Sequence, residues 1–409
     1  MPLTSVAVRT SPPHHTIGTY AESVFSSLHR ADQRRWAETY LHGILFADGK
    51  KSVRGIADSV GIFRANQSLQ QFINQSPWKW EPVRRLIAQH LQAVRPTQAW
   101  VVHRVVIPKR GQRSVGVQRR FVPELGRSVN SQLILAVSLA DEHTAVPVDW
   151  RIALGGDWCT DEALRQAAYI PDAVRGRTEG AEIMDMIDEM RSAWRLEPAP
   201  ITGDIRHFPD AARLVGRLVH LGATFSLQVD GGFPLAGAGR LQALMHTRTA
   251  CHGAERDAPT VRRLLDQQVQ HPAGSVFDGP PGEGAVGRGG PSCRVRIVSA
   301  LARPNVPRSG LQVHPRPLKV IGEVHQDGST RYWVTNMLKH SIDDILAVNG
   351  VGLRGWRDPG VPESEFGLRD FEGRSYRGLH HHLTMVSAAF AFNALDGGYG
   401  LGRVGEDEG

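Results

Sequence analysis

Amide and cationic side chains gather in one short part of the sequence, between residues 50 and 74. Asn and Gln can form paired hydrogen bonds with adenine edges in the major groove, and Lys and Arg can hold DNA phosphates. The candidates for base contacts are Asn66, Gln67, Gln70, Gln71 and Asn74, and those for phosphate contacts are Lys50, Lys51, Arg54 and Arg64. These residues predict a DNA-binding surface, and a helical bundle with an ordinary polar outer face is an equally good interpretation.

Three helices are expected to position these side chains. Apolar residues recur at helical spacing over 32–46, with Asp32 as the expected N-cap, from Ser52 to Gly61, and over 65–75. Two short helices joined by a glycine-containing turn are typical of a helix-turn-helix, whose second helix enters the major groove. We therefore expect residues 1–97 to form a helical DNA-binding domain. A further helix is predicted to start at Ser76-Pro77, with Arg84 and Arg85 on its outer face.

The charge distribution favours an acidic polymer as partner. The chain has 409 residues, 41% of them hydrophobic, and a net charge of +7. Residues 1–97 contain 12 Lys and Arg against 6 Asp and Glu, and residues 98–130 contain 7 against 1, so the basic excess lies in the first third. A solvated basic surface is the alternative interpretation. Further phosphate contacts are expected from Lys109, Arg110, Arg113, Arg119 and Arg120.

Other bulk features narrow the class of protein. No apolar run reaches the roughly 18 residues of a membrane span, so we expect a cytoplasmic protein. The three cysteines are far apart and lack zinc-site spacing, which predicts free thiols.

From residue 98 the hydrophobic period changes from helix to strand. Runs rich in β-branched residues predict strands at 100–107, 114–121 and 132–139. Helices near 160–168 and 180–195 are followed by a strand at 199–204, a helix at 211–221 and a strand at 224–229. Three strands followed by alternating helices and strands are the order of an RNase H-like α/β domain, whose first part we assign to residues 98–230.

Residues 231–312 interrupt this order. The Gly- and Pro-rich stretch from His271 to Pro291 is expected to be flexible, and its flanks are expected to be β structure. The pattern resumes with a strand pair at 318–324 and 331–336, so residues 313–409 are expected to complete the domain and add a C-terminal helix.

Several motifs in chain order resemble those of bacterial insertion-sequence transposases of the DDE superfamily. The most specific is Phe371 to His382, and the others are Gln33-Arg34-Arg35, Ser76-Pro77-Trp78, Arg110 to Val117 and Pro147 to Arg151. The resemblance covers nearly the whole chain. It implies an RNase H-like catalytic domain with a β-rich insertion at 231–312, a dimer on inverted DNA ends, and three carboxylates that hold two divalent metals.

The expected carboxylate positions can be checked against the sequence. Counting back from the turn that begins at Ile107-Pro108, the first acid position holds His103 and Arg104. Asp204 fits the second position, although a turn or N-cap role is an alternative. The third position falls on Trp356, where the nearby Gly and Pro residues make a regular helix unfavourable. An alternative is that another acid replaces the missing ones, and the candidates are Asp149, Asp358, Glu363, Glu365 and Glu372.

The triplet His380-His381-His382 could suggest a soft-metal site. Consecutive helical residues point about 100° apart, so three in a row cannot face one ion. We expect the three histidines to lie at the start of a helix, with some packed inside and some on the surface.

The leading hypothesis is a catalytically inactive, transposase-derived protein that binds double-stranded DNA as a homodimer and regulates transcription. It predicts no metal or other cofactor, and association with the nucleoid. An active Mg²⁺-dependent DDE transposase and a non-catalytic assembly protein are the alternatives.

Overall fold

The computed structural model describes residues 16–62, 65–122, 125–236, 260–270, 276–279, 295–304, 316–325, 327–354 and 366–395. In this part of the chain, the described residues before the first strand are helical or in helix connections. The helices are α1 (Ile17–Val24), α2 (Ala31–Phe46), α3 (Val53–Val60), α4 (Ala65–Asn74) and α5 (Trp80–Val94).

The ends of α3 follow from two residues. The Ser52 side chain caps the helix by accepting a hydrogen bond from the Gly55 backbone amide, at 3.2 Å. Gly61 closes the helix with φ of 62°, a left-handed conformation that favours glycine. The predicted start and end of this helix are therefore confirmed.

Other helix predictions near the N-terminus need correction. Asp32 is not an N-cap, because Arg30 occupies that position and its guanidinium binds the Asp32 carboxylate in the first turn. Helix α5 begins at Trp80 rather than at Ser76-Pro77. Arg84, which was predicted to lie on the outer face of α5, is fully buried, whereas Arg85 is exposed.

One mixed sheet forms the centre of the molecule. Its strands are β1 (Ala99–Pro108), β2 (Gln118–Val122), β3 (Arg127–Ala140), β4 (Ala145–Ile152), β5 (Ile201–Asp204), β6 (Phe225–Val229), β7 (Leu235–Ala236), β8 (Val276–Gly279), β9 (Val295–Pro304), β10 (Leu318–Val324) and β11 (Thr330–Thr335). The strand order is β2-β3-β1-β5-β6-β11-β10-β9-β7, with β4 paired to β3 and β8 to β9.

The predicted strand that starts at 114 begins at Gln118, because residues 114–117 form a turn. Strand β3 is longer than predicted, and its two halves pair with different neighbours, β2 at the start and β4 at the end. Strand β4 contains the Pro147 to Arg151 motif. Strands β5 and β6 run parallel to β1, as the order of an RNase H-like sheet requires.

The described residues between 231 and 312 contribute to the same sheet. Strand β9 lengthens it by pairing antiparallel with β10, and helix α10 (Val261–Gln270) packs against β9 and β10. The sequence patterns did not predict this helix. Of the stretch expected to be flexible, the structure describes β8, and the rest lies outside the described residues.

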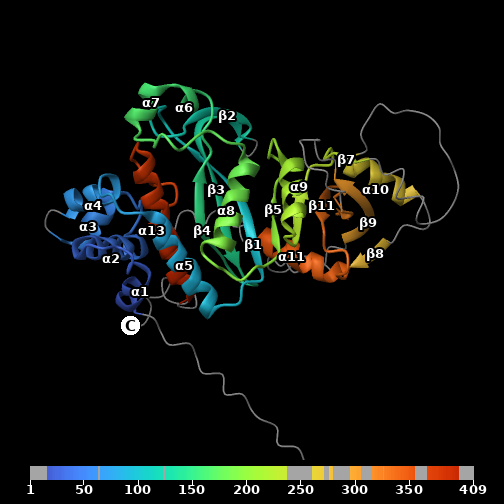
Figure 1. Cartoon of the computed structure of the whole chain (residues 1–409), viewed down its shortest axis with the longest axis horizontal. Coiled ribbons are helices and arrows are strands. Elements are labelled where there is room, and N and C mark those ends of the chain that lie inside the picture. The colour runs from blue at the N-terminus through green and yellow to red at the C-terminus, as the bar shows by residue number, and fades with distance from the viewer. Residues whose placement is uncertain are drawn as a thin grey trace, which may run out of the picture.

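Helices lie on both sides of the sheet and along its β4 edge. Helices α8 (Glu179–Ser192) and α9 (Ala211–Leu221) pack together, and α8 contacts β3 and β4. The short helices α6 (Asp157–Thr160) and α7 (Glu162–Ala167) lie near β2, beyond one end of α13 (Figure 1). Helix α11 (Ile342–Arg354) contacts β1, β5 and β6.

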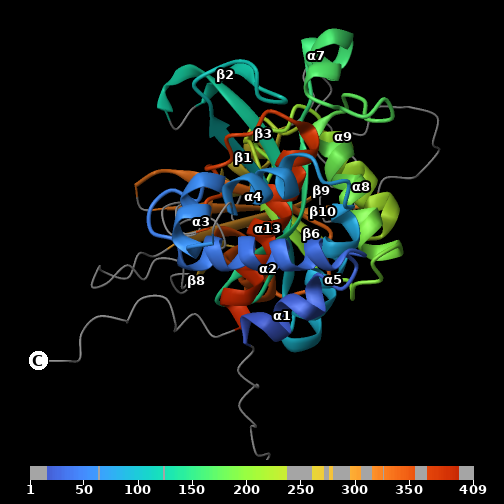
Figure 2. The same ribbon diagram turned by 90° about the vertical axis from the view of Figure 1, so that its left-hand side faces the viewer.

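The C-terminal helix α13 (Tyr376–Leu395) joins the N-terminal helices to the sheet. It contacts α2, α4 and α5 on one side and β4 on the other, and it lies between the two in Figures 1 and 2. One hydrophobic cluster runs through all of these elements. Helices α2, α4 and α5 are therefore packed directly on the last described helix of the chain. No helix in the described ranges is long and apolar enough to cross a membrane.

Candidate functional site

His103 and Asp204 lie at the centre of the sheet. Strands β1 and β5 pair in parallel, and the last paired residues are Val102 and Gly203. Continuing this register by one residue brings His103 beside Asp204, with both side chains on the same face of the sheet. Gly203 permits the close approach, because its φ is +143° and a Cβ there would lie 2.3 Å from the Val102 carbonyl oxygen.

The two residues at the first expected acid position point to opposite faces. Arg104 alternates with His103 along β1, and its Nε donates to Glu179 of α8 at 2.9 Å. His103 is therefore the residue that shares a face with Asp204.

The chemistry around Asp204 does not fit a two-metal centre. Both carboxylate oxygens accept hydrogen bonds from the Arg206 guanidinium, the shortest at 2.5 Å. His103 is buried, and burial holds its pKa well below the ordinary value, so the ring is neutral at pH 7. On the other side, Asp204 pairs with Gln228 of β6, a neutral amide. Mg²⁺ requires oxygen ligands and usually several carboxylates, whereas the first position here offers only ring nitrogens.

Helix α11 covers this face of the sheet where the resemblance expects the third acid. The helix continues through Gly350 and Gly352 to Arg354. The expectation that these glycines would prevent a regular helix is therefore wrong for residues 350–354. Tertiary packing is the reason, because a Cβ at Gly352 would lie 2.8 Å from the Thr202 hydroxyl. Trp356 lies outside the described residues.

Two of the five acids considered as substitutes form ion pairs away from Asp204. Asp149 is paired with Arg84 and Arg151, and Glu372 is paired with Lys50. Asp358, Glu363 and Glu365 lie outside the described residues.

The predicted base-reading helix α4 presents its amides outward. Asn66, Gln67, Gln70 and Gln71 are exposed and Asn74 is half-buried, its amide nitrogen donating to Gln70 at 2.8 Å. The opposite face buries apolar side chains, namely Ala65, Leu69, Phe72 and Ile73. Helices α3 and α4 contact each other, as the two helices of a helix-turn-helix do.

The four predicted phosphate contacts near α4 are placed differently. Lys50 and Arg54 are exposed, and Lys50 is paired with Glu372. Lys51 is buried, and its ammonium donates to the Ala47 carbonyl, which leaves it inside the fold rather than on a DNA-facing surface. Arg64 lies outside the described residues.

The segment 370–377 contacts both the N-terminal helices and the β1 side of the sheet. The Asp370 carboxylate accepts from the Lys51 backbone amide at 2.7 Å, and the Lys109 ammonium donates to the Phe371 carbonyl at 2.8 Å. Burial and the nearby Lys50 lower the pKa of Lys109. Between this segment and α2–α4 lies a pocket of about 570 Å³, with Arg374 and Arg377 in its lining. These two arginines were not among the predicted contacts, although both stand in the motif that resembles transposases.

The remaining predicted cations lie on the β1–β2 connection and on β2. Arg110, Arg113 and Arg119 are exposed. Arg120 is half-buried, and it donates to the Gln118 side chain at 2.9 Å.

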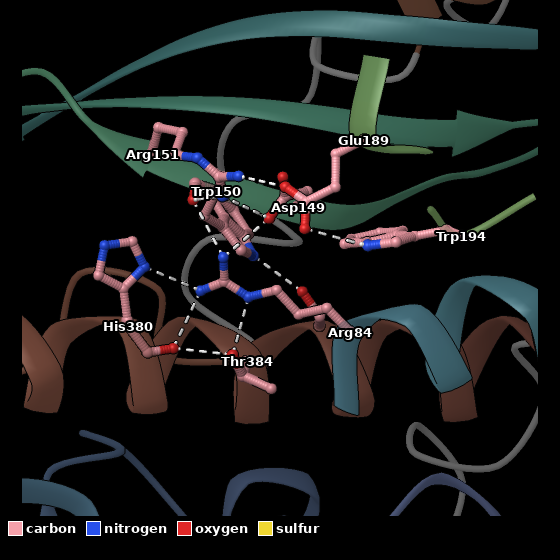
Figure 3. A network of polar contacts seen from close by, with 9 residues as sticks. Arg84, Asp149, Trp150, Arg151, Glu189, Trp194, His380 and Thr384 are labelled. Atoms are coloured by element: carbon pink, nitrogen blue, oxygen red, sulfur yellow. Dashed lines mark hydrogen bonds and ion pairs between the residues drawn. The ribbon is translucent and has the colours of Figure 1, made fainter. Parts of the chain in front are cut away.

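A buried charge network ties α5, α13 and the sheet together (Figure 3). All hydrogen-bonding nitrogens of Arg84 are engaged: Nε donates to Thr384, Nη1 to Asp149 and the Trp150 carbonyl, and Nη2 to the His380 carbonyl, at 2.9 to 3.0 Å. Arg84 and Asp149 are both 0% exposed. An arginine whose i+3, i+4 and i+7 neighbours are all apolar was the sequence signal for this burial, and Ile87, Ala88 and Leu91 are those neighbours.

The network extends to α8. Arg151 donates to Asp149 at 3.0 Å and to Glu189 at 2.7 Å, and the Trp194 indole donates to Glu189 at 3.3 Å. Two cations therefore face two carboxylates, and the network has no net charge when all four groups are ionised.

The histidine triplet is entirely buried, which corrects the expected mixture of packing and surface roles. His380 Nδ1 lies 3.2 Å from Arg84, so it accepts that hydrogen bond as a neutral ring. His381 lies between the Ile73 and Trp78 carbonyls, at 2.8 and 2.9 Å. His382 Nδ1 faces the Tyr40 hydroxyl and Nε2 the Gly367 carbonyl. The three rings thus make separate hydrogen bonds to neighbouring segments.

Burial keeps the rings uncharged. It holds the pKa of His380 well below the ordinary value, and it lowers those of His381 to about 3 and of His382 to about 4. The triplet is therefore part of the packed interior at neutral pH.

Comparison with known proteins identifies the family. The family model described as DDE superfamily endonuclease matches residues 23–273, which is more than half of the chain. Among solved structures, the chain is similar to the piggyBac transposase in a synaptic complex with hairpin DNA, with 11% identity and a TM-score of 0.41, over 93% of this chain and 72% of that chain. Comparison with curated proteins found no match. On the family model, the chain belongs to the DDE superfamily of endonucleases.

Proposed function

We propose that this DDE-family chain is catalytically inactive and acts as a sequence-specific DNA-binding regulator of transcription. The observation that carries the proposal is the environment of Asp204. A neutral, buried imidazole stands at the first acid position, and Arg206 neutralises the acid that remains. A divalent metal at Asp204 would have to compete with the Arg206 guanidinium for the carboxylate oxygens, and the imidazole at the first position offers it no oxygen ligand.

The surface of the N-terminal helices supports DNA binding. The exposed amides of α4 suit base edges in the major groove. Of the exposed cations, Lys50 lies before the preceding helix α3 and Arg54 lies in its first turn. Arg374 and Arg377 continue the cationic surface across the pocket beside α4. The charge and the amides together favour duplex DNA over an uncharged partner.

The regulator would bind as a homodimer on a paired site and associate with the nucleoid. A helix-turn-helix dimer reads two half-sites separated by a whole number of helical turns. A symmetric footprint in the DNA is the expected signature, and a single half-site would contradict the dimer.

Selection of duplexes from a randomised pool tests the sequence-specific binding. The wild-type protein and the variants Gln67→Ala and Gln71→Ala are compared with Glu197→Ala, an exposed position on a distant loop. We expect the wild type and Glu197→Ala to enrich the same sequence, whereas the glutamine variants relax the preference at one or two base pairs, each with about a tenfold loss of discrimination. Failure of the wild-type protein to retain any duplex at low salt would overturn the proposal and favour an assembly role.

A further inference from the structure

The edge strand β2 forms a short two-stranded ribbon with the beginning of β3. Residues 118–122 pair antiparallel with 127–131, and β2 ends the strand order of the sheet. The ribbon lies at the top of both views, at the outer end of the sheet (Figures 1 and 2).

The outward face of the ribbon combines an aromatic ring with cationic and polar side chains. Arg119 pairs with Asn130 and Phe121 with Ser128, and directly opposed residues share a face. Phe121 is 63% exposed, and Leu125, in the connection to β3, is 46% exposed. A phenyl ring this exposed on a strand gains little from the fold itself.

The other face holds the ribbon in place. The Trp158 indole donates to the Val117 carbonyl at 2.9 Å, directly before β2. The Gln118 side chain packs on the backbone of Gly155 and Gly156, where an added Cβ would lie about 3 Å from its amide nitrogen. Val122 is buried. The exposed face is therefore presented on a rigid support, which limits the entropy lost when a partner binds.

The charge of this region selects the partner. Residues 109–131 contain six basic residues and one acidic residue, Glu124. A second copy of the chain would not pair well along β2, because Arg119 and Arg120 would face the same arginines across the new edge. A polyanion with an apolar surface between its charges is complementary to the ribbon, and duplex DNA has phosphates on both sides of a groove lined by bases.

We propose that the β2–β3 ribbon enters the major groove of duplex DNA, with Phe121 and Leu125 against the bases and Arg119 on a flanking phosphate. The major groove admits a two-stranded ribbon, and an aromatic ring there can contact thymine methyl groups. The proposal rests on the proposed DNA binding and assigns to the sheet a second contact, separate from α4.

The salt dependence of binding separates the two kinds of contact. The affinity for a short duplex selected by the wild-type protein is measured between roughly 50 and 200 mM salt. Phe121→Ala is expected to weaken binding about tenfold with an unchanged slope of log K against log salt, because the lost contact is apolar. Arg119→Ala is expected to weaken binding and reduce the slope by about one, because one phosphate contact is lost.

Leu301→Ala is the matched control for truncation of an exposed apolar residue, since Leu301 is 39% exposed on β9. It should bind as the wild type does, and thermal unfolding should show that Phe121→Ala remains folded. If the wild type binds DNA and Phe121→Ala binds it equally well, the ribbon proposal is overturned and the proposed function is not. A Phe121→Ala defect on single-stranded DNA but not on the duplex would also overturn it, whereas absence of any wild-type binding would overturn the proposed function as well.

Discussion

The buried pair Arg84–Asp149 provides the sharpest stability prediction. Replacing Asp149 by Asn keeps the shape of the side chain and removes its charge, while Arg84 stays 0% exposed with its other hydrogen bonds in place. Arg151 still pairs with Glu189 at 2.7 Å in this variant, so Arg84 is the cation that loses its carboxylate partner. Breaking a buried ion pair by removing one partner typically costs about 3–5 kcal/mol, and we expect about 3 because one oxygen of Asp149 has no hydrogen-bond partner in the wild type.

Urea unfolding of the full chain measures this loss. Asp185→Asn is the control, because Asp185 is paired with Arg177 on the surface and its removal should cost no more than about 1 kcal/mol. The double variant Arg84→Met, Asp149→Asn should recover part of the loss, since the unpaired cation is gone. An unfolding midpoint of Asp149→Asn equal to that of Asp185→Asn would refute the reasoning.

The remaining predictions concern the buried histidines and the packing of α11. His381 and His382 have folded pKa values of about 3 and about 4 against about 6.5 when unfolded, so their stabilisation is complete above about pH 6.5 and decreases as the pH falls toward the folded values. At about pH 5 each of these two histidines should lower the free energy of unfolding by about 2 kcal/mol relative to neutral pH. A urea midpoint that does not change between pH 7 and pH 5 would contradict this. Gly352→Ala should destabilise the chain by about 1–3 kcal/mol through its contact with Thr202, despite the better helix propensity of Ala; a raised melting temperature would show that α11 is not packed as described.

Local signals predicted the helices and strands where the sequence contains its own boundaries. Ser52 and Gly61 define α3 because capping and a left-handed turn depend on a few neighbouring residues. The strands around the centre of the sheet were predicted for a similar reason, since β-branched runs bounded by turns are a local pattern.

The interior charges could not be predicted in the same way. Charged residues are normally assigned to the surface, so Arg84 was placed outside and the histidine triplet was partly placed there. Their burial depends on Asp149, Ile73 and Gly367, which come from distant parts of the chain. Periodicity does not contain this information, because it describes which residues share a face and not what that face meets.

The candidate site, too, was predicted only in part. The motif resemblance located His103, Arg104 and Asp204 in the sequence. Register was needed to show that His103 faces Asp204 while Arg104 points to α8, and side-chain geometry was needed to show the pairing with Arg206.

Incubation of the purified protein with supercoiled plasmid and fragmented genomic DNA in Mg²⁺ or Mn²⁺ tests the central claim most directly. Sequencing of the DNA ends reports cleavage, and the same libraries report which fragments are retained; Asp204→Asn is the matched variant. We predict retained, discrete fragments with unaltered ends, identical for the wild type and Asp204→Asn. New ends that depend on the metal and disappear with Asp204→Asn would show that the carboxylate beside His103 still supports strand cleavage, and would contradict an inactive DNA-binding protein.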